Sequence, residues 1–388
     1  MSWKPHFRRF LEADPARLHF AAHSHHYWPD VAFEAQQACW NDAARLADGK
    51  WDKIFGEVIP ETQRRVARIL KLPDPTTLAF GPNTHSFLLR LLSCLPQERP
   101  IAVLASDGEF HSLTRQMKRL EEAGRARVSW IPTEPFATFE ARFKEAAVQG
   151  RHDLVYVSQV FFNSGFALAD LPGLVATVPH RETLIAVDGY HAFMARPLDI
   201  AAVADRAFYL AGGYKYAMAG EGCCFIHCPP GYGARPLDSG WFAGFGALAA
   251  PPGDGLGYAD DGSRFLGATF DPVGLYRLNA VLSWQEEHCP IDEIADHAVM
   301  LQELFLERLA DLGRPRLTLD HLLSPRDPAR RGNFLAFRTP EAGPIHKTLL
   351  SENIVTDHRG DVLRFGFGVY QDEEDVRRLV AALGCVLA

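Results

Sequence analysis

The chain reads Leu184-Ile185-Ala186-Val187-Asp188-Gly189-Tyr190-His191 and then Ala207-Phe208-Tyr209-Leu210-Ala211-Gly212-Gly213-Tyr214-Lys215-Tyr216. Each stretch begins with a short apolar run, which is typical of a buried strand. The first run ends in a carboxylate at Asp188, and the second is followed by an amine at Lys215, 27 residues further along. The two stretches therefore each deliver one reactive group at the end of a predicted strand.

A lysine and an aspartate delivered in this way suit the chemistry of pyridoxal phosphate (PLP). The lysine forms a Schiff base with the cofactor, and the aspartate keeps the pyridine nitrogen protonated, so that the ring can absorb electrons from a substrate carbanion. An isolated pair would more often be a strand cap and a solvated surface lysine. The neighbours that favour the cofactor interpretation are His191, Pro197, Asp199, Gly220 and Gly222.

Residues 184–226 resemble the class V aminotransferase superfamily of fold-type I PLP enzymes, and kynureninase most closely. In that family an Asp, a His three residues later, Pro-x-Asp, Tyr-Lys-Tyr and a Gly-rich turn follow in the same order. The resemblance implies that Lys215 and Asp188 act in catalysis and that His191 lies beside the cofactor. It also implies that Tyr214 bonds the cofactor phosphate and takes part in proton transfer.

Composition restricts the class of protein. With 388 residues the chain exceeds one typical hydrophobic core, so two domains are expected. A net charge of −8 argues against nonspecific nucleic-acid binding, and no apolar run approaches the ~20 residues of a membrane span. The N-terminus carries no apolar signal core, so we expect a cytoplasmic protein. The seven cysteines form no CxxC pair and are expected to be free thiols.

The predicted fold is α/β, with three parts. An N-terminal segment, 1–45, packs on the site and the small domain; a large PLP-binding domain spans 46–272; and a smaller α+β domain spans 273–388. The large domain should hold a mostly parallel seven-stranded sheet. Its candidate strands are 78–80, 101–104, 128–131, 154–157, 184–187, 207–211 and 223–227. The small domain should hold helices over 274–288, 291–312, 345–352 and from Glu373, with strands at 316–319, 334–338 and 362–367.

A predicted anion site follows the first strand. Gly81-Pro82-Asn83-Thr84-His85-Ser86 precedes the amphipathic helix 87–95, and the free N–H groups and dipole of a helix N-terminus favour an anion. An ordinary helix cap is an equally good interpretation of this segment alone. The resemblance aligns Asn83, Thr84 and His85 with the Thr-Thr-Ser of the kynureninase phosphate loop, which makes Thr84 the best side-chain ligand.

The resemblance implies further cofactor contacts. Phe110 takes the place of the aromatic residue that stacks on the PLP ring, and Ser164 aligns with the Thr of a Thr-Gly pair. Ser239-Gly240-Trp241-Phe242 matches the Ser-Gly-Trp-Phe whose Trp nitrogen contacts the phosphate. Thr269, in Gly267-Ala268-Thr269, corresponds to a residue that reaches the phosphate of the neighbouring subunit. The protein is therefore expected to be a homodimer with shared active sites.

Substrate contacts are expected from two further regions. Arg364, in Asp361-Val362-Leu363-Arg364-Phe365-Gly366-Phe367, aligns with the arginine that binds the substrate α-carboxylate, and guanidinium geometry suits this task. His23, His25 and His111 are expected to contact the substrate, although they depart from the family, as does Leu113. The spacing of His19 and His23 would allow a metal site on a helix, but His19, His23, His25 and His26 lie in a segment that looks extended, so no metal is expected.

The predicted function is kynureninase-like hydrolysis of the Cβ–Cγ bond of a γ-keto α-amino acid. A class V aminotransferase, a racemase or epimerase, or a β-lyase remains an alternative, because these enzymes share every cofactor residue. A binding protein that kept the fold without turnover is a weaker alternative. The identity of the amino acid and the role of the four histidines stay open.

Overall fold

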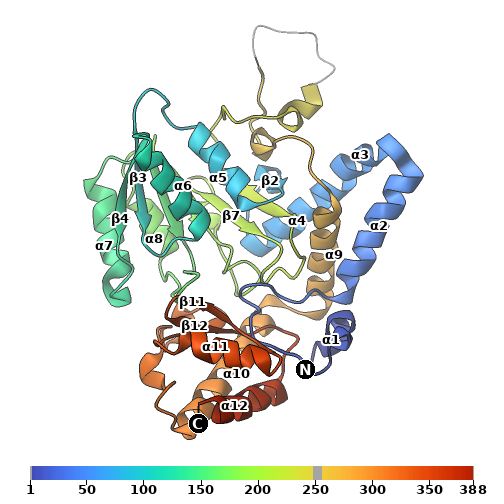
Figure 1. Ribbon diagram of the computed structural model, residues 1–388. Helices are drawn as coiled ribbons and strands as arrows, with labels where there is room; N and C mark the ends of the chain where they lie inside the picture. The colour runs from blue at the N-terminus through green and yellow to red at the C-terminus, as the bar shows by residue number, and fades with distance from the viewer. Residues whose placement is uncertain (1, 248–255, 388) are drawn as a thin grey trace.

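A seven-stranded sheet forms the centre of the large domain in the computed structural model, which describes residues 2–247 and 256–387. The strand order is β2 (Leu78–Gly81), β8 (Cys224–His227), β7 (Phe208–Gly212), β6 (Leu184–Asp188), β5 (Leu154–Ser158), β3 (Ile101–Ser106) and β4 (Ala126–Ile131) (Figure 1). The pairs from β7 to β4 are parallel, whereas β8 is antiparallel to both of its neighbours. All seven predicted strands and the mostly parallel sheet are confirmed.

Helices cover both faces of this sheet, which explains why its strands are apolar on both sides. Leu154, Leu184 and Phe208 pack with α5 (Thr84–Ser93) and α6 (His111–Glu122) on one face. The alternate residues, such as Val155 and Ile185, pack on the other face with the remaining helices of the large domain. These helices are α4 (Ile59–Leu70), α7 (Phe136–Gln149) and α8 (Leu171–Ala176).

The small domain is built on an antiparallel sheet in the order β11 (Asp357–Arg359), β12 (Val362–Gly366) and β9 (Phe334–Arg338). Its helices are α10 (Ile291–Leu312), α11 (Ala342–Ser351) and α12 (Glu373–Val386), and α9 (Val273–His288) leads into it. The strand predicted at 316–319 is wrong. Thr318 instead caps a short 3-10 helix, Leu319–His321, because its backbone N–H donates to His321 Nδ1 at 3.0 Å and its hydroxyl accepts from the Asp320 N–H.

The N-terminal segment crosses from the small domain to the large one. After α1 (Arg8–Ala13), β1 (Leu18–His19) pairs with β10 (Ile354–Val355) in parallel, and Ala21 bridges Gly366. A few residues later the His26 N–H donates to the Tyr214 carbonyl at 3.2 Å. The chain then enters α2 (Asp30–Leu46), which packs along α9, and the short helix α3 (Lys50–Lys53) (Figure 1). Residues 18–26 thus touch both the small-domain sheet and the loop that carries Lys215.

Across residues 2–247 and 256–387, no helix is both long enough and apolar enough to span a bilayer.

Candidate active site

A cavity of about 420 Å³ lies where the parallel strands end. Asp188 is the last residue of β6, Ser158 is the last residue of β5, and Lys215 follows β7 by three residues. Strand ends of this kind are where open α/β sheets bind ligands. The lining includes eight of the predicted site residues: Asn83, Thr84, His85, Phe110, Asp188, His191, Tyr214 and Lys215.

Lys215 is buried in this cavity, with only 6% of its surface exposed. Its Nζ lies 2.5 Å from His191 Nε2 and 5.3 Å from the centre of the Phe110 ring. Burial lowers the pKa of the Lys215 amine to about 7, because the charged form loses its hydration. Near neutral pH a large share of the amine is therefore unprotonated, which is the form that attacks a carbonyl.

Asp188 is held by two donors at the base of the cavity. The Tyr190 N–H donates to Oδ1 at 2.9 Å, and the Tyr156 hydroxyl donates to Oδ2 at 3.2 Å. Burial raises the pKa of the Asp188 carboxyl, and the nearby Lys215 opposes that rise. A cationic ligand group beside Asp188 would further stabilise its charged form.

Glu109 is a buried carboxyl that the sequence interpretation left without a role, although it directly precedes Phe110. It accepts hydrogen bonds from the Ser106 hydroxyl at 2.5 Å and the Ser158 hydroxyl at 2.6 Å. Burial raises its pKa to about 7, and Asp188 adds to this effect. Ser158 lines the cavity, so Glu109 orients one of its polar groups.

The N-terminus of α5 also lines the cavity. Asn83 is the helix cap, because its Oδ1 accepts from the Ser86 N–H at 2.9 Å. Thr84 and His85 occupy the first helical turn, where backbone N–H groups have no partner within the helix. His85 Nδ1 is buried without a hydrogen-bond partner in the described part of the chain. This part of the cavity is therefore rich in donors and suited to an anion.

Tyr214 lines the cavity, whereas His25, a predicted substrate residue, does not. The two rings stack at 5.3 Å, and His25 Nε2 lies 3.7 Å from the Glu221 carboxylate, which also lines the cavity. Burial raises the pKa of the Tyr214 hydroxyl to about 12, so it is protonated at neutral pH. His111 lies beyond the rim, where it lines a neighbouring pocket together with His85.

Arg364 lies behind Phe162, whose ring lines the cavity. One terminal nitrogen of Arg364 pairs with Asp357, and the other donates to the Phe162 carbonyl at 2.6 Å. The ring of His23 stacks on Phe334 at 4.7 Å, and its Nε2 lies 3.6 Å from Asp357 Oδ2. The two predicted substrate residues, Arg364 and His23, thus share Asp357 as a neighbour.

Three predicted cofactor residues lie outside the cavity of their own chain. For Ser164, the hydroxyl accepts from the Phe166 N–H at 3.1 Å and the residue does not line the cavity, so its cofactor contact stays a prediction. Trp241 and Thr269 are both exposed, and Trp241 Nε1 donates to the Thr269 hydroxyl at 3.0 Å. Neither side chain lines the cavity around Lys215.

The four N-terminal histidines point to different partners. His19 Nδ1 lies 2.6 Å from the Tyr370 hydroxyl, and His26 Nδ1 lies 2.6 Å from the Tyr27 carbonyl. His23 faces Asp357 and His25 faces Glu221. Within the described residues, no group of three or more His, Cys, Asp or Glu side chains is arranged to hold a metal ion.

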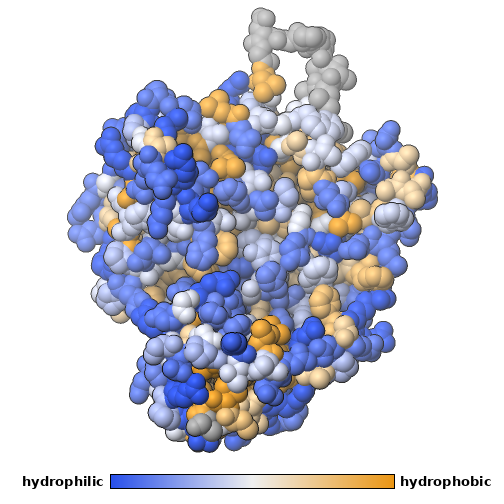
Figure 2. All heavy atoms as spheres, in the orientation of Figure 1, coloured by the Kyte–Doolittle hydropathy of each residue, from blue (hydrophilic) through white to orange (hydrophobic). Residues whose placement is uncertain are grey.

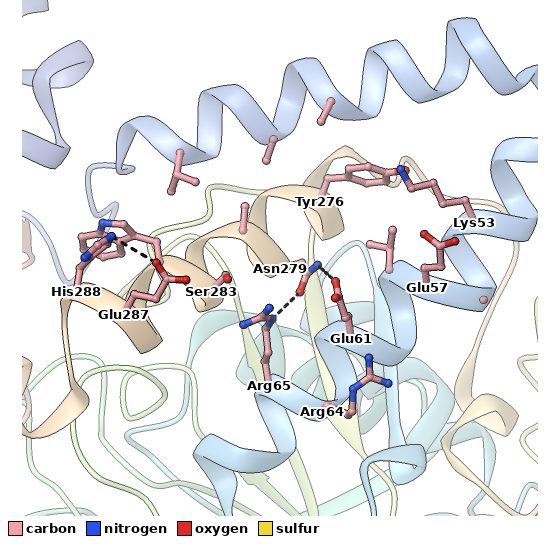
Figure 3. A pocket seen from close by; sticks show the side chains of 17 residues that line it. Lys53, Glu57, Glu61, Arg64, Arg65, Tyr276, Asn279, Ser283, Glu287 and His288 are labelled. Carbon is pink, nitrogen blue, oxygen red and sulfur yellow. Dashed lines mark hydrogen bonds and ion pairs between the residues drawn. The ribbon is translucent and has the colours of Figure 1, made fainter.

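A larger pocket, of about 820 Å³, lies between α2, α4 and α9 and shares no lining residue with the Lys215 cavity. Figure 3 shows that polar side chains in this pocket pair with one another. Asn279 bonds both Arg65, at 3.1 Å, and Glu61, at 2.9 Å, and His288 lies 3.7 Å from Glu287. Several of its polar groups thus pair with one another.

Sequence comparisons relate the chain to kynureninases. Residues 294–383 match the family model of the kynureninase C-terminal domain. The chain is 27% identical to the kynureninase of Deinococcus radiodurans over 245 residues, which are 60% of this chain and 57% of that protein. It is 26% identical to a kynureninase of Pseudomonas fluorescens over 246 residues, 60% of this chain and 56% of the relative. The matched region thus spans somewhat more than half of each relative.

Similar solved structures cover nearly the whole chain. A mutant of C-DES with glycine covalently linked to the PLP cofactor has a TM-score of 0.77 at 19% identity, over 97% of this chain and 98% of that one. The cysteine desulfurase CsdA of Escherichia coli has a TM-score of 0.80 at 16% identity, over 99% and 97%. At such identities the likeness establishes the fold. The predicted fold-type I architecture and the predicted resemblance to kynureninase are both confirmed.

Proposed function

We propose that this chain, a distant relative of kynureninases with a fold-type I architecture, is a PLP-dependent enzyme that hydrolyses the Cβ–Cγ bond of a γ-keto α-amino acid. One observation carries the proposal. A buried amine, Lys215, and a half-buried carboxylate, Asp188, line a cavity that the donor-rich N-terminus of α5 also lines. These three features could bind the three reactive or charged groups of the cofactor: Lys215 the aldehyde, Asp188 the pyridine nitrogen and the helix N-terminus the phosphate.

The donor set of the cavity fits the cofactor. Lys215 would hold it covalently, Asp188 would pair with the protonated ring nitrogen, and Phe110 would lie against the ring. The first turn of α5, with Thr84 and the unpartnered Nδ1 of His85, would receive the phosphate. When bound, PLP supplies an electron sink that stabilises negative charge at the substrate α-carbon.

The remaining residues supply proton transfer and orientation. Lys215 would be the base that removes the α-proton, and its lowered pKa of about 7 suits that task at neutral pH. Arg364 holds the substrate α-carboxylate. Tyr214 is the candidate acid and base, because its hydroxyl is protonated and the residue lines the cavity. The net reaction adds water across Cβ–Cγ: the hydroxyl joins the γ-carbon, and a proton joins the β-carbon.

Purified protein supplied with PLP should turn yellow, and borohydride should fix the cofactor to Lys215. Peptide mapping by mass spectrometry locates the adduct, and Lys71→Ala, which alters an exposed lysine paired with Asp199, should leave it unchanged. An α-amino acid with an aryl ketone at Cγ should then yield alanine and the aryl carboxylic acid. A protein that binds no PLP would contradict the cofactor assignment. Release of a keto acid, a racemised amino acid or a β-elimination product would contradict the hydrolase and support an alternative.

We also propose that the enzyme is a homodimer in which Thr269 reaches the phosphate of the partner's cofactor. Trp241 and Thr269 lie on the surface, away from the cavity of their own chain. Three large apolar side chains of the same segment are exposed: Leu237 by 71%, Trp241 by 43% and Leu256 by 62%. Figure 2 shows hydrophobic residues scattered over an otherwise largely hydrophilic face. An interface with a second copy would remove these three apolar side chains from water.

Mixing two damaged variants tests the shared site. Lys215→Ala should be inactive, and Thr269→Ala should be weak when PLP is limiting. A hybrid dimer would hold one site made only of intact residues, so refolded mixtures should recover roughly a quarter of the wild-type sites if subunits pair at random. A mixture of Lys215→Ala with Lys215→Gln is the control and should recover nothing. If both parents are dimers and their mixture stays inactive, Thr269 does not act across subunits.

A further inference from the structure

Unpaired nitrogens gather beside the catalytic cavity. Of the buried side-chain atoms that lack a hydrogen-bond partner in the described chain, four belong to His23, His191 and Arg364: both ring nitrogens of His23, Nδ1 of His191 and Nε of Arg364. A buried polar group without a partner costs about 1–3 kcal/mol, so native proteins keep such groups where a ligand or water pairs with them. Their grouping therefore indicates a binding site.

The ring of His23 is fixed in place. It is 1% exposed, and it stacks on Phe334 with an angle of 22° between the ring planes. A Cβ at position 366 would lie 2.3 Å from His23 Nδ1, so Gly366 leaves the room that the ring occupies. His191 contacts the same Phe334 ring at 5.5 Å and Lys215 at 2.5 Å, so Phe334 and His191 link His23 to the amine of Lys215.

The guanidinium of Arg364 uses only some of its N–H groups in bonds to the protein. One terminal nitrogen donates to Asp357 and the other donates to the Phe162 carbonyl, while Nε has no partner in the described part of the chain. A guanidinium has five N–H donors, so one edge of Arg364 is still able to bind a carboxylate. Within the described residues, Nε is thus the guanidinium nitrogen of Arg364 that has no protein partner.

The charges around Asp357 also favour an incoming anion. Asp357 pairs with Arg364 and lies 3.1 Å from Arg359, so one carboxylate faces two guanidinium groups. Burial acts to raise the pKa of the Asp357 carboxyl, but His23 and the two arginines hold it well below its usual range. Asp357 is therefore ionised, and the group as a whole keeps one positive charge that a second carboxylate would neutralise.

We infer that His23 is a second ligand of the substrate α-carboxylate, donating one ring N–H beside Nε of Arg364, which Asp357 orients. The assignment rests on the proposed function for the nature of the substrate. Burial lowers the pKa of His23 to about 4, so the ring is neutral at neutral pH and offers one N–H. Its Nε2 is 3.6 Å from Asp357 Oδ2, too long for a strong hydrogen bond, and so is available to a ligand.

A matched pair of probes tests this inference without turnover. 3-Phenylpropionate and 3-phenylpropionamide differ only in the carboxylate, and neither carries an amine that could react with the cofactor. Calorimetry on PLP-loaded wild type should show preference for the carboxylate. His23→Phe, which retains a flat ring against Phe334, should reduce that preference by about tenfold, because one hydrogen bond to a charged group is lost. His23→Gln, which keeps an N–H, should retain part of it.

His19→Phe is the control, because His19 lies in the same segment and faces Tyr370 instead. It should leave the preference for the carboxylate unchanged. Equal preference in wild type and folded His23→Phe would overturn the inference, as would a wild type that does not distinguish the two probes. The same titration on protein without PLP separates the two proposals. A carboxylate preference that depends on His23 in a protein unable to bind PLP would uphold the inference and reject the proposed function.

Discussion

Asp188→Asn should lower kcat by about 10²–10³-fold while the protein still binds PLP, the loss reported when one preorganised electrostatic contact is removed. The amide keeps the size of the carboxylate, and its oxygen still accepts a hydrogen bond from the Tyr190 N–H or the Tyr156 hydroxyl. It carries no charge, however, and so cannot hold a proton on the ring nitrogen. Steady-state rates and the visible spectrum of the loaded protein measure the two effects separately.

Asp199→Asn serves as the control for this experiment. Asp199 pairs with Lys71 on the surface, so losing its charge should change kcat very little. A variant at Asp188 that keeps wild-type kcat, with PLP bound, would show that the carboxylate does not act on the cofactor. A variant that loses PLP entirely would indicate that Asp188 mainly provides affinity.

Arg364→Lys should retain PLP and lose about 2–4 kcal/mol of substrate binding, which is roughly 30- to 1000-fold in kcat/KM. Lysine keeps the positive charge that Asp357 requires, but it cannot contact Asp357, the Phe162 carbonyl and a substrate carboxylate in one plane. The loss should therefore appear mainly in KM. Initial rates over a range of substrate concentrations separate KM from kcat.

Arg338→Lys is the matched control for the arginine variant. Arg338 lies on β9 of the same small-domain sheet, but it pairs with Glu134 at the surface. Its replacement should leave KM unchanged. Thermal unfolding of both variants checks that the fold survives, and unchanged KM in a stable Arg364→Lys protein would reject the substrate contact.

Local patterns in the sequence predicted the sheet and much of the cavity. The strands were recognisable because each is an apolar run buried on both faces, as in Leu184–Asp188. Asp188 and Lys215 meet because parallel strands end at one edge of a sheet, so motifs that are far apart in sequence converge there. The helix that carries Thr84 was recognisable from the polar turn before it.

Hydrogen-bond partners were not predictable from local sequence patterns. The Phe162 carbonyl, 202 residues before Arg364, accepts a hydrogen bond from one terminal nitrogen of Arg364. No local sequence pattern predicts that contact. Ser164 was assigned to the cofactor by alignment, and no local pattern indicated that its hydroxyl accepts from the Phe166 N–H. The strand expected at 316–319 failed for a similar reason, because Thr318 caps a helical turn that hydrophobicity alone does not indicate. Such choices depend on which of several possible hydrogen bonds the folded chain makes.

The N-terminal crossing segment connects the two groups that would bind the substrate in the proposed function. Phe20 bonds Val355 and Gly366 of the small domain, while His26 bonds the carbonyl of Tyr214, the residue before Lys215. The distance between Arg364 and Lys215 is thereby tied to a short stretch of backbone, residues 20–26. If the proposed function holds, lengthening this stretch by one residue should change that distance and, with it, the backbone length of the amino acids that the enzyme accepts.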